Sequence, residues 1–352
     1  MTASDRQAQL TQWLGQCAQL EHLDNIVLQP CSGDAGFRQY FRIQGSSEFL
    51  AVNAPPEQID STIFVKLVQY LREQGIHAPQ VYAVDLARGF LLIEYFGDQL
   101  YLSALNADSV ESLYGEALLT LLRLQQSPYD EKLFADYDSE KLREEMELFP
   151  HWFVGRLLGY VMTDIETAQL ERVFKALIDS ALAQPAVLVH RDYHSRNLIQ
   201  RSVGPPGVID FQDAVWGPVT YDLVSLLKDC YVRWPNSNVK RWAQAYGSML
   251  TSAGLIKPVS TAQFQQWFDW MGLQRHFKVL GIFARLFLRD NKSAYLHDLP
   301  LVIRYVLETT ADYSQFAPFN QWFRQRLLPL CEQQHWYQNY RNAGFSPAEA
   351  KP

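Results

Sequence analysis

The segment that reads VHRDYHSRN, residues 189–197, carries the residues whose types and spacing could do chemistry. Asp192 and Asn197 are five residues apart in it, and Asp210 follows thirteen residues after Asn197. Short β-type runs enter and leave the segment, which predicts that Asp192 lies on a loop and Asp210 in a separate strand over 208–211. A carboxylate can accept or orient the proton of an acceptor hydroxyl, while an amide oxygen and a second carboxylate are hard ligands for magnesium on a nucleotide. The pattern therefore favours a phosphoryl-transfer site.

This motif, H-x-D-x-x-x-x-N followed by I-D-F, resembles the aminoglycoside phosphotransferase and choline kinase family, relatives of the protein kinases. The similarity covers nearly the whole chain, because residues 33–42 look like a nucleotide loop, residues 91–98 look like the connection between two lobes, and residues 217–222 continue the match. Within that superfamily, three further segments, 148–152, 272–279 and 289–292, resemble the bacterial anomeric kinases. Those enzymes phosphorylate the C1 hydroxyl of N-acetylmuramic acid and N-acetylglucosamine in cell-wall sugar recycling.

The resemblance implies a role for each matching residue. Asp192 would be the catalytic base, Asn197 and Asp210 the metal ligands, and Asp222 a buried carboxylate that supports the catalytic loop. The residues that it implies for nucleotide binding are Gly33, Asp34, Gly36, Arg38, Glu94, Tyr95 and Phe96. ATP and Mg²⁺ would be the cofactors, and a sugar hydroxyl would be the acceptor of the γ-phosphate. This is the reaction of a phosphotransferase with an alcohol acceptor.

One position departs from the kinase pattern. Kinases carry a lysine on the third strand that pairs with the α- and β-phosphates. Here that strand reads FLAVN, and Asn53 stands near the expected lysine. Arg38 or Arg42, on the preceding strand, could supply the missing positive charge. A chain that has lost phosphate binding, and so acts as a non-catalytic nucleotide-binding regulator, is the alternative.

The predicted acceptor-site residues are Asp213, Arg275 and His276. Arg275 and His276 are candidates because an anionic sugar substituent or a developing sugar phosphate needs nearby cations, whereas Asp213 could instead be a surface carboxylate or a helix cap. The same helix face, which includes Lys278, could instead be a solvated surface. Aminoglycosides and choline-like alcohols remain alternative acceptors. A protein kinase is disfavoured because Asp210-Phe-Gln lacks the glycine of D-F-G.

His190, Asp192 and His194 alternate, a spacing that could also suggest a transition-metal site. No further ligands with zinc-like spacing accompany them. We therefore interpret His190 as a structural residue that supports its loop by hydrogen bonding.

The elements that must position these residues change character along the chain. Strand-like runs dominate the first hundred residues, with one helix inserted at 63–73, and helical periods dominate from Asp108 onward, including one over 142–158. Strands followed by helices predict an α+β fold. The resemblance implies a bilobal, protein-kinase-like form of it, with a small antiparallel lobe over 1–97 and a larger, mainly helical lobe over 98–352.

Composition excludes several classes of protein. The 48% of hydrophobic residues excludes intrinsic disorder, and a net charge of −7 with a pI of 5.6 argues against a nucleic-acid partner. The apolar run at 279–288 is too short to span a bilayer and contains Arg285, and the N-terminus lacks a signal-peptide pattern. We expect a cytoplasmic protein whose partner is a small-molecule sugar, without nucleic acid or membrane.

Overall fold

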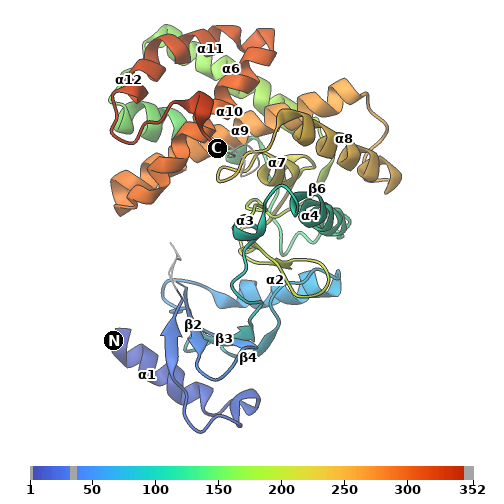
Figure 1. The fold of residues 1–352 in the computed structure, drawn as a ribbon, viewed down its shortest axis with the longest axis vertical. Coiled ribbons are helices and arrows are strands. Elements are labelled where there is room, and N and C mark those ends of the chain that lie inside the picture. The colour runs from blue at the N-terminus through green and yellow to red at the C-terminus, as the bar shows by residue number, and fades with distance from the viewer. Residues whose placement is uncertain (1–2, 32–37, 345–352) are drawn as a thin grey trace. The chain divides into compact units, whose positions relative to one another are not determined.

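The computed structural model describes residues 3–31 and 38–344 (Figure 1). The chain divides into two compact units. The first consists of the residues up to Ala104 together with Arg196–Asp213, and the second of Leu105–Ser195 together with the residues from Ala214 onward. The first unit therefore receives a second, short stretch of chain. The predicted lobe boundary near Gly97 stays a prediction.

The first unit is built on an antiparallel sheet of five strands in the order β1-β2-β3-β5-β4. The strands are β1 (Leu28–Pro30), β2 (Gln39–Ile43), β3 (Phe49–Asn53), β4 (Val81–Asp85) and β5 (Phe90–Glu94). The helices are α1 (Ala3–Leu14), a 3-10 turn (Ala18–Leu20), α2 (Ser61–Glu73) and α3 (Tyr101–Ala104). A separate two-stranded pair joins β7 (Leu198–Ile199) to β8 (Gly207–Val208).

Helix α1 covers one face of this sheet. Leu10, Trp13 and Leu14 pack in one core cluster with Phe49 and Ala51 of β3. These helix positions have the i, i+3, i+4 spacing of an amphipathic helix. Because successive strand side chains point to opposite faces, the cluster defines which residues of β3 face α1.

The second unit is mainly helical. Its helices are α4 (Val110–Gln125), α5 (Ser139–Leu148), a π-helical segment η2 (Phe149–Leu157), α6 (Asp164–Leu182), α7 (Tyr221–Leu227), α8 (Asn236–Ser252), α9 (Thr261–Asp290), α10 (Leu299–Asp312), α11 (Ala317–Trp322), a second π-helical segment (Phe323–Leu327) and α12 (Leu328–Glu332). Short 3-10 turns occur at Ser293–Asp298, Ser314–Phe316 and Tyr340–Asn342. Strands β6 (Ala186–Val189) and β9 (Val215–Pro218) form a two-stranded sheet.

Helix α9 is the central helix of this unit, and its residues are buried without interruption from Trp267 to Gly281. A helix that is buried all round belongs to the interior of a large core. At Gly281 an added Cβ would lie 2.3 Å from the carbonyl carbon of Leu148, the last residue of α5. This close approach requires glycine.

The predicted helix over 142–158 is divided into α5 and η2. Pro150, which has no N–H to donate, stands at the change from α-helical to π-helical hydrogen bonding. The periodicity of the apolar residues therefore located the helical segment but not its division.

The predicted strand over 208–211 is wrong at its end. Strand β8 stops at Val208, and Asp210 has a φ of 65°, in the left-handed region that a strand residue does not adopt. The strand β9, which the sequence did not predict, pairs with β6 along Ala186–Val189. Pairing between segments so distant along the chain depends on tertiary packing rather than on local pattern.

No helix among the described residues combines the length and the hydropathy that a membrane span needs.

Candidate functional site

The loop that carries Asp192 follows β6 directly and spans residues 190–195 of the second unit. Its start is held by Asp222 of α7, whose Oδ2 accepts a hydrogen bond from the His190 N–H at 2.6 Å and whose Oδ1 accepts one from the Arg191 N–H at 3.0 Å. Arg191 has a φ of 74°, a strained conformation for a residue with a long side chain. Asp222 is fully buried, and burial raises its pKa to about 7 against the opposing effect of the two N–H groups.

His190 is also buried, with its ring nitrogen Nδ1 3.3 Å from the backbone nitrogen of Asp192. The loop thus receives side-chain contacts from both predicted support residues. Among the described residues, no group of three or more His, Cys, Asp or Glu side chains is arranged to hold a metal ion.

Asp192 lies beside two buried cations of α9. The Nη2 of Arg275 is 4.0 Å from Oδ1 of Asp192, and the Asp192 side chain keeps 38% of its surface exposed. Desolvation acts to raise the pKa of Asp192, but the positive charges of Lys278 and Arg275 outweigh it and lower the pKa to about 2. The carboxylate is therefore ionised throughout the neutral range and accessible to a hydroxyl.

The idea that residues 275–278 form a solvated helix face is wrong, because Arg275, His276 and Lys278 are all buried. Arg275 donates a hydrogen bond from Nη2 to Ser225 Oγ at 2.7 Å. His276 stacks on the Tyr305 ring, and its Nε2 lies 3.2 Å from the Lys228 carbonyl oxygen. An acceptor contact for Arg275 or His276 stays a prediction.

Glu145 of α5 is a buried carboxylate that the sequence did not reveal, and it connects the Asp192 loop to α9. Glu145 forms ion pairs with Arg191 of the loop and with Lys278, the latter at 3.0 Å, and Lys278 also donates to Tyr221 Oη at 3.0 Å. Burial acts to raise the pKa of Glu145, but Lys278 and Arg191 lower it overall. Glu145 stands in a charged run, EEMEL, that looks like a solvated surface, so nothing in the local sequence distinguishes it.

The first unit carries the predicted metal ligands. Asn197 immediately precedes β7, and its amide nitrogen Nδ2 lies 3.3 Å from Oδ2 of Asp210. Gln212 Nε2 donates to Oδ1 of Asp210 at 2.6 Å. Asp210 is exposed, and the amide groups of Asn197 and Gln212 lie within hydrogen-bonding distance of its carboxylate. One carboxylate and one amide oxygen fit magnesium, which prefers oxygen donors and retains several waters.

A stack of rings connects Arg38 to Phe211, the residue that follows Asp210 in the chain. The guanidinium of Arg38 lies over the Phe64 ring of α2, 4.5 Å from the centroid, and Phe64 stacks on Phe211 at 5.4 Å. Arg38 is buried, and its Nε has no hydrogen-bond partner among the described residues. Arg42, the other candidate cation, is half-exposed and forms an ion pair with Asp98.

Asn53 lies on the α1 face of β3, together with Phe49 and Ala51. Its Oδ1 accepts hydrogen bonds from Nε and Nη2 of Arg6, at 2.9 and 2.6 Å. Arg6 is a buried cation of α1 that sequence reasoning did not consider. Asn53 therefore serves the packing of α1 on the sheet, and Gln39, bonded to its Nδ2 at 3.0 Å, shares this face.

The predicted adenine-contacting segment, Glu94 to Phe96, leaves β5 at its end. The Glu94 N–H is bonded to the Gln80 carbonyl oxygen and the Tyr95 N–H to that of Glu48, both at 2.8 Å. Among the described residues, no backbone carbonyl accepts from the N–H of Phe96. Within the described part of the chain, Phe96 is thus the residue of the three whose N–H makes no hydrogen bond to the backbone.

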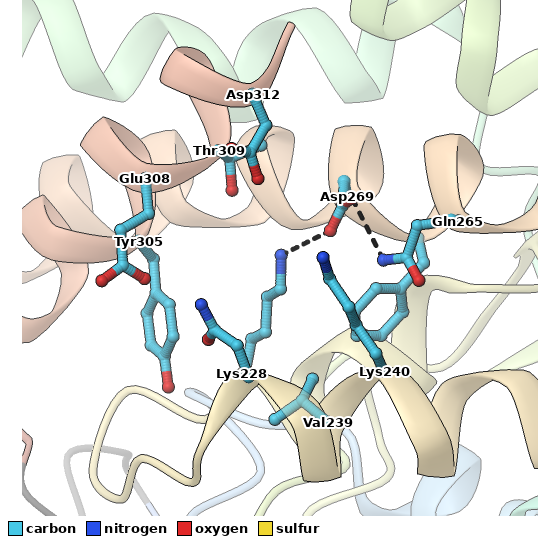
Figure 2. A pocket seen from close by; sticks show the side chains of 11 residues that line it. Lys228, Val239, Lys240, Gln265, Asp269, Tyr305, Glu308, Thr309 and Asp312 are labelled. Atoms are coloured by element: carbon cyan, nitrogen blue, oxygen red, sulfur yellow. Dashed lines mark hydrogen bonds and ion pairs between the residues drawn. The ribbon is translucent and has the colours of Figure 1, made fainter. Parts of the chain in front are cut away.

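Four predicted residues have not yet been described. Gly33, Asp34 and Gly36 are outside the described residues, and Asp213 is exposed in a turn before β9. A small groove in the second unit is lined by none of the predicted residues. Figure 2 shows Lys228 and Asp269 paired across it, at 2.7 Å. Its lining residues are Lys228, Asn236, Val239, Lys240, Gln265, Phe268, Asp269, Tyr305, Glu308, Thr309 and Asp312.

Comparison with known proteins gives consistent matches. Residues 27–256 match the phosphotransferase enzyme family. The sequence is 45% identical to an N-acetylmuramate/N-acetylglucosamine kinase of Pseudomonas putida, over 90% of this chain and 95% of that protein. It is 43% identical to the enzyme of that name from Pseudomonas aeruginosa, over 84% and 87% of the two chains, and 37% identical to that of Neisseria meningitidis, over 89% and 93%.

Solved structures confirm the predicted α+β, protein-kinase-like fold class. The ADP-bound crystal structure of the aminoglycoside phosphotransferase APH(2'')-Ib superposes with a TM-score of 0.59 at 16% identity, covering 86% of this chain and 98% of that one. An ethanolamine kinase of Plasmodium vivax gives a TM-score of 0.59 at 13% identity, covering 88% and 87%.

Proposed function

Because the chain belongs to the phosphotransferase enzyme family, we propose that it is an ATP-dependent kinase of N-acetylmuramate and N-acetylglucosamine. The γ-phosphate is transferred to the anomeric C1 hydroxyl. The observation that carries the acceptor assignment is the similarity to enzymes named for these two sugars, at up to 45% identity over nine tenths of the chain. Such a reaction serves the recycling of cell-wall sugars and takes place in the cytoplasm, where ATP is available.

In this proposal Asp192 orients the attacking hydroxyl. An ionised carboxylate accepts a hydrogen bond from the C1 hydroxyl and then its proton as the phosphoryl group leaves the nucleotide. The low pKa of Asp192 favours orientation over strong basicity, which suits a transition state in which the protein contributes mainly positioning and charge stabilisation. Arg275 and Lys278 keep the carboxylate ionised.

The nucleotide half of the reaction belongs to residues of the first unit. Asn197 and Asp210 would hold Mg²⁺, and Phe96 would offer its N–H to the adenine edge. When bound, Mg²⁺ neutralises phosphate charge. Arg38 takes the phosphate-pairing role of the missing strand lysine, because its buried Nε lacks a partner among the described residues, whereas Arg42 is paired with Asp98.

A direct test combines the purified chain with ATP, Mg²⁺ and each of four acceptors: N-acetylmuramate, N-acetylglucosamine, choline and kanamycin. ADP formation identifies the acceptor, and ³¹P and ¹³C NMR of the product locate the phosphate. We expect turnover with the two amino sugars and phosphate on C1. Phosphate on C6 would refute the anomeric assignment alone, while nucleotide binding without turnover on any acceptor would favour a non-catalytic regulator.

A cationic acceptor such as an aminoglycoside or choline is the second candidate, on the basis of fold alone. The three cations on the loop or beside it, Arg191, Arg275 and Lys278, are paired with the carboxylates of Glu145 and Asp192. The preference for the amino sugars therefore rests on the similarity to the kinases named for them.

A further inference from the structure

The 190–195 loop is fastened at its end as well as at its start. Asp229, two residues after α7, accepts two hydrogen bonds at Oδ2: one from the Ser195 N–H at 3.0 Å and one from Ser195 Oγ at 2.5 Å. Ser195 and Asp229 are 0% and 1% exposed, so water does not compete for these bonds. A buried carboxylate with charge-assisted hydrogen bonds makes a strong anchor.

The second oxygen of Asp229 extends the anchor to a neighbouring segment. Its Oδ1 accepts from the Tyr231 N–H at 3.0 Å, and the Tyr231 ring makes an edge contact with His194, with centroids 5.4 Å apart. His194 in turn donates its N–H to the Asp192 carbonyl oxygen at 3.0 Å. A short chain of contacts thus runs from Asp229 to the backbone of Asp192.

We propose that Asp229 is a positioning residue for phosphoryl transfer, which holds the end of the Asp192 loop while Asp222 holds its start. This inference rests on the proposed kinase function. Two anchors are needed because the left-handed Arg191 between them is strained, and such a conformation persists only where its surroundings over-determine it. Ser195 is also the last residue of this stretch of the second unit, so the anchor holds the Asp192 loop at its very end.

The test is a double-mutant cycle on kcat with Asp229→Asn and Ser195→Ala. A small misplacement of a reacting group lowers the rate steeply, so we expect each single change to reduce kcat by roughly 10- to 100-fold. The KM values for ATP and sugar should stay within about twofold, because neither residue contacts a substrate. The double variant should be no slower than the slower single one, since both changes break the same anchor.

The matched control is Glu308→Gln on α10. Glu308 is a half-buried carboxylate that, like Asp229, accepts side-chain hydrogen bonds, here from Arg233 and Arg304, but it lies outside the loop contacts. The Glu308→Gln variant should have a lower free energy of unfolding than the wild-type chain and the same kcat. Unchanged kcat in Ser195→Ala, or rate losses that simply multiply in the double variant, would overturn the positioning role. Should Asp229→Asn not fold, Ser195→Ala, which deletes only one hydrogen bond, decides alone.

Hydrogen–deuterium exchange separates this inference from the proposed function. In Ser195→Ala the amides of 190–195 should exchange faster than in the wild-type chain, while those of α10 are unchanged. If the wild-type chain phosphorylates none of the acceptors, the proposed function fails, and the exchange of the loop still decides whether the anchor exists. Equal exchange in both proteins would contradict the anchor itself.

Discussion

Asp192 is a carboxylate whose ionisation is maintained by its surroundings rather than by water. Two cations of α9 offset the cost of its partial burial, and the loop around it is pinned by Asp222. Such an arrangement keeps the group charged and oriented at once. The chemistry therefore depends on the residues that surround Asp192 as well as on Asp192 itself.

Replacement of Asp192 by asparagine tests its role directly. The amide keeps the shape but cannot take a proton, so we expect kcat to fall by roughly 10²-fold or more, as for a lost general base. ATP binding, measured by calorimetry, should be unchanged. Turnover equal to that of the wild-type enzyme would reject the assignment.

Arg38 and Arg42 offer a matched comparison, since both lie on or next to β2. Arg38→Met should raise the KM for ATP roughly tenfold, because a buried cation at the phosphates contributes on the order of 1.5 kcal/mol. Arg42→Met should have little effect, because the Arg42–Asp98 pair is exposed. Steady-state kinetics with varied ATP distinguishes the two, and equal effects would remove Arg38 from the phosphate site.

His276 gives the fold a pH dependence of known sign. Burial lowers the pKa of His276 to about 3, against an ordinary value near 6.5. The unfolded chain therefore binds one more proton than the folded one between these values, so stability contributed by neutral His276 is present above pH 6.5 and lost on acidification.

Protonation of His276 in the unfolded chain makes the wild-type free energy of unfolding fall by about 1.4 kcal/mol for each pH unit below 6.5. We expect this contribution to be absent in His276→Gln, so that the variant loses less stability than the wild-type chain between pH 6.5 and 5. Urea unfolding of both proteins at each pH measures it, and the Gln side chain keeps a donor for the Lys228 carbonyl. If the unfolding free energies of the two proteins fell equally with pH, His276 would have to become protonated in the folded protein as readily as in the unfolded chain.

At the scale of elements, α9 brings two cations to Asp192 and packs closely on the end of α5. Gly281 is the point of closest approach, where an added Cβ would meet the backbone of Leu148. Because Arg275 and Lys278 are part of the same buried helix, a shift of α9 here also moves the charges beside the loop.

Gly281→Ala should lower the free energy of unfolding by about 2–3 kcal/mol, since overpacking against backbone atoms cannot be relieved by a side-chain rotation. Gly115→Ala is the control: Gly115 is an exposed residue of α4 with nothing within 4 Å of an added Cβ, and helix propensity predicts a gain of about 0.5–1 kcal/mol. Denaturant titrations compare them. A neutral Gly281→Ala would mean that α9 moves freely against α5.

At the scale of the whole molecule, the proposed roles divide between the two units. Arg38, the 94–96 segment, Asn197 and Asp210 belong to the first, and Asp192 with its cations to the second. The chain passes from one set to the other at Ser195–Arg196. The motif of residues 190–197 is continuous in the sequence, but its first six residues belong to the second unit and its last two to the first.

Ligand-dependent hydrogen exchange tests this division. ATP with Mg²⁺ should slow exchange in 94–97 and 196–213, and the amino sugar in 190–195, because bound ligand suppresses the local opening that permits exchange. Mass spectrometry of peptides resolves these segments. Protection by ATP confined to the second unit would contradict the assignment of the nucleotide residues.

The sequence by itself determined the fold class and the identities of Asp192, Asn197 and Asp210 as candidates. Strand and helix periods are local properties, and a motif with fixed spacing is legible without knowledge of packing. The five-stranded sheet and the helices from Val110 onward were accordingly predictable. The left-handed turn at Asp210 was not, because nothing in the residues 208–211 opposes a strand.

Only the tertiary structure decided which residues support those candidates. Glu145 and Asp229 lie far from Asp192 along the chain, and their charges become partners of the loop only when α5 and α7 pack beside it. Asn53 likewise faces α1 and Arg6 because the strand alternates and α1 covers that face. Contacts between distant segments are set by burial of the whole core, and a local pattern contains no record of them.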